Sequence, residues 1–86
     1  MGTTRRPQSK YLARKMRQIR ECLNLTQAEI IERLDYKYPL TQGTLSNIER
    51  GEREAPVPLI LSYAKLAKIS TDFLIDDSLE LPKQFL

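Results

Sequence analysis

The chain of 86 residues contains no histidine, no tryptophan and only one cysteine, Cys22. A single cysteine cannot form an internal disulfide, and tetrahedral zinc sites are built from several Cys and His ligands, so neither is expected. Without histidine the commonest general base is missing, and the three glycines lie apart rather than in a phosphate-binding loop. Because few catalytic groups remain, we expect no enzymatic activity, no bound metal and no cofactor. Cys22 is interpreted as a reduced packing residue.

Long apolar runs are also missing. The longest contain three residues, as at Leu59, Ile60 and Leu61, whereas a membrane-spanning helix needs roughly 20. No apolar stretch follows the first charges, Arg5 and Arg6, so we expect no secretory signal, no contact with a membrane and a cytoplasmic location. With 41% hydrophobic and 29% charged residues, the composition is typical of one small folded domain.

The charges are distributed unevenly along the chain, although the net charge is only +3. Residues 1–20 carry seven basic groups and no acid, whereas residues 72–86 carry four acids and one lysine. This asymmetry favours a surface at one end that faces a polyanion, with a solvated helix face beside a solvated tail as the alternative. The seven basic residues are Arg5, Arg6, Lys10, Arg14, Lys15, Arg17 and Arg20.

The spacing of apolar residues predicts an all-α fold. Residues such as Leu12 and Met16 recur every three or four positions, as on one face of a helix, and no stretch alternates as a strand does. Capping and stop residues delimit the helices, as where Thr26 precedes Glu29 in a capping box and where Gly51 ends a helix. The five predicted helices cover about residues 9–23, 27–34 and 42–50, a stretch from Pro58 to about 67, and a short segment after Ser70.

Three further local features follow from the same pattern. Ser9, Thr41 and Ser70 are placed to cap the first, third and fifth predicted helices. Asn24 is expected to close the first helix in a left-handed conformation. The apolar residues 73–75 of the short fifth helix are expected to face the core.

Several stretches resemble the helix-turn-helix core of the phage repressor and Cro family, which includes the XRE-like transcriptional regulators. They are Leu25, Thr26 and Gln27 with the following Ile30, the run of residues 41–51, and residues 63–70, which are similar to the fourth helix of the family and the start of its fifth. The resemblance covers about residues 9–75. It implies a compact five-helix, repressor-like DNA-binding domain. From their residue types, residues 1–8 are expected to form a flexible basic arm and residues 76–86 an acidic tail with a candidate dimer contact.

The chain departs from this family in two places. The connector between the second and third predicted helices is about four residues longer than the tight turn of the family, and Ile31 stands where the family prefers alanine. A bulky side chain between two closely packed helices requires a compensating shift, which a longer connector can supply.

The third predicted helix carries polar side chains on the face opposite Leu45 and Ile48, and such a helix fits the major groove of B-DNA. Gln and Asn can make paired hydrogen bonds to adenine. Gly43, which is costly inside a helix, allows a close approach to base edges, unless it merely lies in a loosely held first turn. Thr44 either faces the bases or packs sideways. The candidate base contacts are Gln42, Gly43, Thr44, Ser46 and Asn47.

Phosphate contacts are expected around this helix. The resemblance implies one for Gln27, and basic residues near the end of the third helix and in the connector are further candidates. The basic arm is expected to follow the DNA backbone or enter the minor groove, with a solubilising terminus as the alternative. The candidate phosphate contacts are Gln27, Thr41, Arg50, Arg53, Lys37, Arg5, Arg6 and Lys10. The resemblance also implies a structural ion pair between Arg20 and Glu49.

These features favour a sequence-specific DNA-binding transcriptional regulator, expected to be a repressor, that reads a near-palindromic operator as a homodimer and is nucleoid-associated when bound. One copy reads too few base pairs for useful specificity, so the chain is expected to supply its own dimer contact. The alternative is a protein-interaction module of the same fold, such as a toxin-neutralising antitoxin that also autoregulates by binding DNA, with a protein partner on the acidic tail. The apolar residues available for such contacts are Phe73, Leu79, Leu81, Phe85 and Leu86.

Overall fold

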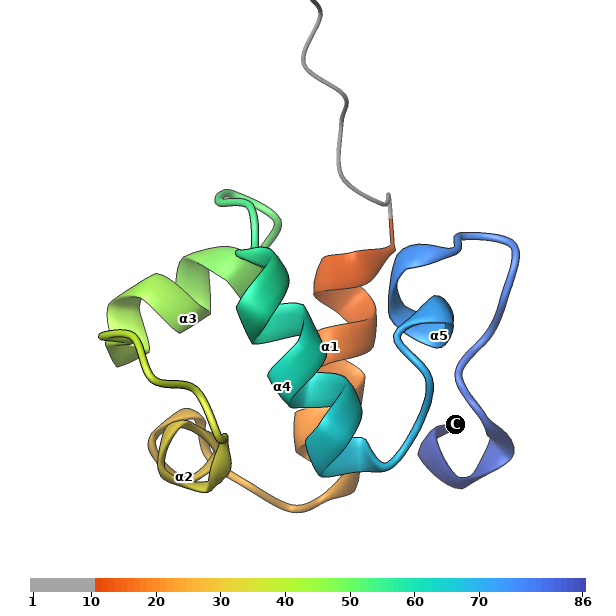
Figure 1. The fold of residues 1–86 in the computed structure, drawn as a ribbon, viewed down its shortest axis with the longest axis horizontal. Coiled ribbons are helices and arrows are strands. Elements are labelled where there is room, and N and C mark those ends of the chain that lie inside the picture. The colour runs from red at the N-terminus through yellow and green to blue at the C-terminus, as the bar shows by residue number, and fades with distance from the viewer. Residues whose placement is uncertain (1–10) are drawn as a thin grey trace, which may run out of the picture.

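The computed structural model describes residues 11–86, which form a bundle of short helices without a strand (Figure 1). This confirms the predicted all-α, five-helix fold. The five α-helices and a final 3-10 helix are α1 (Leu12–Cys22), α2 (Gln27–Arg33), α3 (Gln42–Glu49), α4 (Val57–Ala67), α5 (Asp72–Ile75) and η1 (Lys83–Phe85). Across residues 11–86, every helix is too short or too polar to cross a membrane.

Left-handed residues end three of the helical segments. Asn24 (φ 59°) follows α1 and Gly51 (φ 77°) follows α3, as their residue types predict. The third, Lys68 (φ 59°), ends α4, and a lysine gives no sequence signal for this conformation. The predicted cap Ser9 lies outside the described residues. The fifth helix begins one residue later than a Ser70 cap predicts, because Thr71 takes the N-cap position, although the Ser70 hydroxyl accepts a hydrogen bond from the Asp72 amide at 3.2 Å.

The core is organised around α1, which packs against α3, α5 and η1. Its inward residues Met16 and Ile19 are fully buried. They belong to one apolar cluster that includes side chains from every other helix, which is what the periodic spacing predicts for an amphipathic helix. One inward assignment is wrong: Ile75 is 50% exposed, because α5 has a single turn and only Leu74 of its residues points fully into the core.

The acidic tail folds back onto α1 instead of extending into solvent. In Figure 1 it lies with α5 on the side of α1 away from α2 and α3. Leu81 and Phe85 are 3% and 5% exposed and belong to the core. The expectation that these two side chains provide a free apolar surface is therefore wrong, while Leu79 and Leu86 remain exposed.

Polar side chains of α1 hold the tail through its backbone carbonyl groups. The ammonium group of Lys15, a residue only 1% exposed, donates to the carbonyl oxygens of Asp76 (3.0 Å) and Leu79 (2.7 Å). Gln18 Nε2 donates to the Phe85 carbonyl oxygen at 2.6 Å. Cys22 is exposed, not a packing residue, and its Sγ lies 3.0 Å from the Gln84 carbonyl oxygen. The tail is thus part of the folded domain.

We expect Leu81→Ala to lower the free energy of unfolding by about 2–5 kcal/mol, because it removes a buried side chain and leaves a cavity. The matched control is Leu86→Ala, which makes the same chemical change at a side chain that is 69% exposed and should shift stability by less than about 0.5 kcal/mol. Urea denaturation of both variants measures the difference. Equal losses would contradict the packing of the tail.

Helix α2 begins with the predicted capping box. The Thr26 hydroxyl accepts a hydrogen bond from the Glu29 amide at 3.1 Å, and Glu29 Oε1 accepts one from the Thr26 amide at 2.8 Å. The hydrogen bond from the Thr26 backbone is the main cause that lowers the pKa of Glu29. Because hydrogen bonds to the charged form favour ionisation, folding is stabilised by the ionised carboxylate.

A group whose pKa is lowered in the folded state stabilises the fold above its unfolded pKa and loses that contribution as the pH falls. We therefore expect Glu29→Gln, which keeps a side chain suited to the capping box, to be less stable than the wild type at pH 7. The difference should shrink below about pH 4.3. Urea unfolding measured from about pH 3 to about pH 7 tests this. The control is Glu32→Gln, which changes an exposed glutamate of the same helix. A difference that does not change with pH would contradict it.

Candidate nucleic-acid interface

Helix α3 is fixed in orientation by its buried side. Leu45 and Ile48 are 0% and 2% exposed, so the opposite side of the helix faces solvent. The Thr41 hydroxyl caps its start by accepting a hydrogen bond from the Thr44 amide at 3.1 Å. The five candidate base contacts fall on the accessible part of the helix: Gln42 and Gly43 are exposed, and Thr44, Ser46 and Asn47 are half-buried.

Gly43 has no role in the packing of the protein itself. A Cβ atom at this position would meet only the Thr41 side chain, at an ordinary contact distance of 3.9 Å. Alanine would therefore fit, and glycine, which costs about 0.8–1.0 kcal/mol relative to alanine in a helix interior, occupies the first turn of α3. Neither space nor backbone conformation within the chain requires glycine here, so position 43 leaves the start of α3 open to a close approach from outside.

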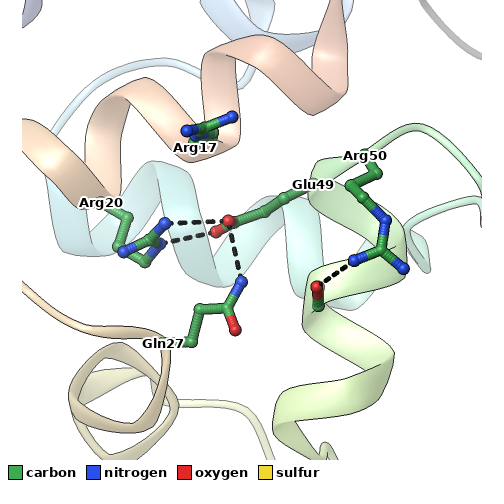
Figure 2. A pocket seen from close by; sticks show the side chains of 6 residues that line it. Arg17, Arg20, Gln27, Glu49 and Arg50 are labelled. Atoms are coloured by element: carbon green, nitrogen blue, oxygen red, sulfur yellow. Dashed lines mark hydrogen bonds and ion pairs between the residues drawn. The ribbon is translucent and has the colours of Figure 1, made fainter.

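A buried ion pair joins the end of α1 to the end of α3 (Figure 2). Arg20 Nε donates to Glu49 Oε2 at 2.8 Å and Nη2 donates to Oε1 at 3.0 Å, while Nη1 donates to the Leu25 carbonyl oxygen at 2.9 Å. The two side chains are 14% and 4% exposed. The hydrogen bond to Glu49 is the main cause that raises the pKa of Arg20, so the guanidinium stays charged.

Gln27, the first residue of α2, is attached to the same carboxylate. Its Nε2 donates to Glu49 Oε1 at 3.2 Å, so one glutamate on α3 holds side chains from both α1 and α2 (Figure 2).

The hydroxyl of the core residue Tyr63 has no hydrogen-bond partner among residues 11–86. The pKa of Tyr63 is raised by its burial and, to a smaller extent, by the nearby Glu49.

A cleft of about 200 Å³ opens beside this ion pair. Three guanidinium groups line it against one carboxylate, which is already paired with Arg20, so the cleft is suited to an anion. Arg17 was not among the candidate contacts, although it lies one helical turn before Arg20, and this spacing was the available signal. It forms an exposed pair with Glu21 at 3.0 Å. The lining residues are Arg17, Arg20, Gln27, Ser46, Glu49 and Arg50.

The remaining candidate phosphate contacts are more scattered. Thr41 and Arg53 are exposed near the two ends of α3, while Arg50, exposed at its C-cap, also lines the cleft. Lys37 is exposed in the connector and lines a second hollow, formed with α4, rather than the cleft beside the ion pair. Arg5, Arg6 and Lys10 lie outside the described residues.

The long connector between α2 and α3 is anchored to α4. The Ser62 hydroxyl, on α4, donates to the Asp35 carbonyl oxygen at 3.0 Å. The rings of Tyr36 and Tyr38 lie 5.4 Å apart, and Tyr36 packs against the core while Tyr38 is 60% exposed. Despite the added residues, α2 and α3 pack against one another, so the extra length lies at the surface.

We expect Glu49→Gln to lower the free energy of unfolding by roughly 3 kcal/mol, because it leaves the charge of Arg20 without its buried partner. Glu52→Gln is the matched control, since Glu52 pairs with Arg50 at 3.2 Å where both side chains are more than half exposed. Such exposed pairs contribute less than about 1 kcal/mol. Urea unfolding compares them, and similar losses for the two variants would count against the structural role of Glu49.

The family comparison agrees with this geometry. The model of a helix-turn-helix family matches residues 16–74, which include α2, α3 and the residues of the ion pair. No curated protein and no solved structure is significantly similar to the chain. The match covers most of the chain and the fold has the expected helices in the expected order, so the chain belongs to the helix-turn-helix family of Cro/C1-type, XRE-like DNA-binding transcription regulators.

Proposed function

We propose that the protein is a sequence-specific transcriptional repressor that places α3 in the major groove of its operator. The observation that carries the proposal is Gly43, an exposed helical glycine that the packing of the chain does not require. It lies on the accessible side of α3 together with Gln42 and Asn47, whose amide groups match the hydrogen-bonding edges of bases.

The cleft beside α3 supports a phosphate contact at the edge of the groove. Gln27 is held there by Glu49, and Arg17 is the arginine of the cleft least committed to the protein, since its pair with Glu21 is exposed. Phosphate contacts of this kind fix the register of a recognition helix without reading sequence. In the proposed complex, the phosphate contact in the cleft contributes affinity, and the base contacts on the accessible side of α3 contribute specificity.

The length of α3 supports binding as a homodimer to a near-palindromic operator. Its eight residues span about 12 Å at about 1.5 Å per residue, which corresponds to only three or four base pairs at about 3.4 Å each. Two copies related by a two-fold axis would double this reading. Of the apolar side chains expected at the dimer contact, Leu79 and Leu86 remain accessible.

Selection of bound duplexes from a random pool tests this function. We expect an enriched site with two half-sites about 10–10.5 base pairs apart, or a multiple of that distance. Affinity should fall with salt, with a slope of about −0.9 per phosphate contact in a plot of log affinity against log salt. Recovery of no enriched sequence, together with a flat salt dependence, would exclude the proposal and favour a protein-interaction module.

Within the selected site, Gln42→Ala should reduce discrimination at one base pair by about 1–3 kcal/mol, because it removes an amide that reads a base edge. Gln84→Ala is the matched control, because Gln84 is exposed in η1 on the far side of α1. Titration of both variants with the selected duplex and with single base-pair changes measures the effect. Equal losses of Gln42→Ala on selected and random duplexes would show that Gln42 does not read sequence.

A further inference from the structure

Arg50, at the C-cap of α3, is hydrogen-bonded to two of the candidate base contacts, Ser46 and Asn47. Its Nη1 donates to Ser46 Oγ at 2.6 Å, and its Nη2 donates to Asn47 Oδ1 at 2.5 Å and to Glu52 Oε1 at 3.2 Å. Figure 2 shows the Arg50 side chain turned back along α3. The charge of Arg50 is thus partly balanced by Glu52, and its guanidinium lies on the side chains that would meet the bases.

This arrangement determines which groups of Asn47 and Ser46 are available. A guanidinium has N–H donors and no acceptor, so Asn47 must present its carbonyl oxygen to Arg50 and its NH2 group must point away. The Ser46 hydroxyl accepts from Arg50, which leaves its own O–H free to donate elsewhere. Both residues therefore offer donors to a ligand.

The hydrogen-bond donors of Ser46 and Asn47 match the major-groove edge of guanine better than that of adenine. Asparagine reads adenine by donating to N7 and accepting from the N6 amino group, whereas guanine presents two acceptors, N7 and O6, in the major groove. A second lone pair on Asn47 Oδ1 remains, but an amino group bound there would bring its positive hydrogens next to a guanidinium that already donates to the same oxygen.

We infer that Arg50 sets the base preference of α3: by holding Ser46 and Asn47 through their oxygen atoms, it makes them readers of guanine instead of adenine. This inference rests on the proposed function, since it requires α3 to lie in the major groove. It assigns Arg50 a positioning role in specificity, in addition to any contact with phosphate.

The test compares wild type, Arg50→Met and Arg53→Met on the selected operator. Asn47→Ala first identifies the base pair that Asn47 reads, as the position at which discrimination is lost. Wild type should prefer guanine there, and Arg50→Met should lower the ratio of affinities for guanine and adenine by about tenfold, because the amide becomes free to pair with adenine. Arg53→Met, which changes an exposed arginine just beyond α3, should weaken both duplexes equally.

Three results would overturn the inference: an unchanged ratio in Arg50→Met, a preference of the wild type for adenine at this position, or no loss of discrimination in Asn47→Ala at any position. Each of them leaves the proposed function intact if the wild type still binds its selected site with a steep salt dependence. A wild-type protein that binds no duplex would instead overturn the proposed function, and the inference with it.

Discussion

The interface depends on the carboxylate of Glu49, which binds α1 through Arg20 and α2 through Gln27. Burying two charges is costly unless the geometry is good and the remaining donors are satisfied. Here the pair is bidentate, and a third nitrogen of Arg20 is used by the Leu25 carbonyl oxygen. Because Glu49 is the last residue of α3 and Gln27 the first of α2, this small network fixes two helix ends relative to each other beside the cleft proposed for a phosphate.

Helix α1, which carries Arg20 of this network, also holds the tail. Arg20 points from α1 toward α3, whereas Lys15 and Gln18 bind carbonyl groups of residues 76–85. In a chain of 86 residues, a core built from the helix-turn-helix alone buries little apolar area, and Leu81 and Phe85 add to it. The tail therefore stabilises the scaffold from the side of α1 that lies away from α2 and α3 (Figure 1).

Local signals in the sequence were sufficient for most of the fold, because caps and apolar spacing act within one or two helical turns. The capping box at Thr26 and the left-handed Gly51 are examples. The position of the tail could not be predicted in this way, since it depends on contacts between Lys15 and carbonyl groups more than 60 residues away. For the site, residue types on α3 indicated which face is polar, but not that Arg50 engages Ser46 and Asn47.

The structure also changes what the basic N-terminal part contributes to binding a polyanion. Among residues 11–20, Lys15 and Arg20 are committed to partners inside the protein, and phosphate cannot replace these without exposing the core or breaking the ion pair. Arg14 and Arg17 have exposed partners in Glu80 and Glu21, and such pairs are weak enough to exchange for a phosphate. Fewer charges are therefore available to DNA than the sequence suggests. Each phosphate contact adds affinity without sequence information. With two of the four basic residues among 11–20 committed to the fold, the contacts proposed for the accessible side of α3 would supply a larger share of the binding free energy.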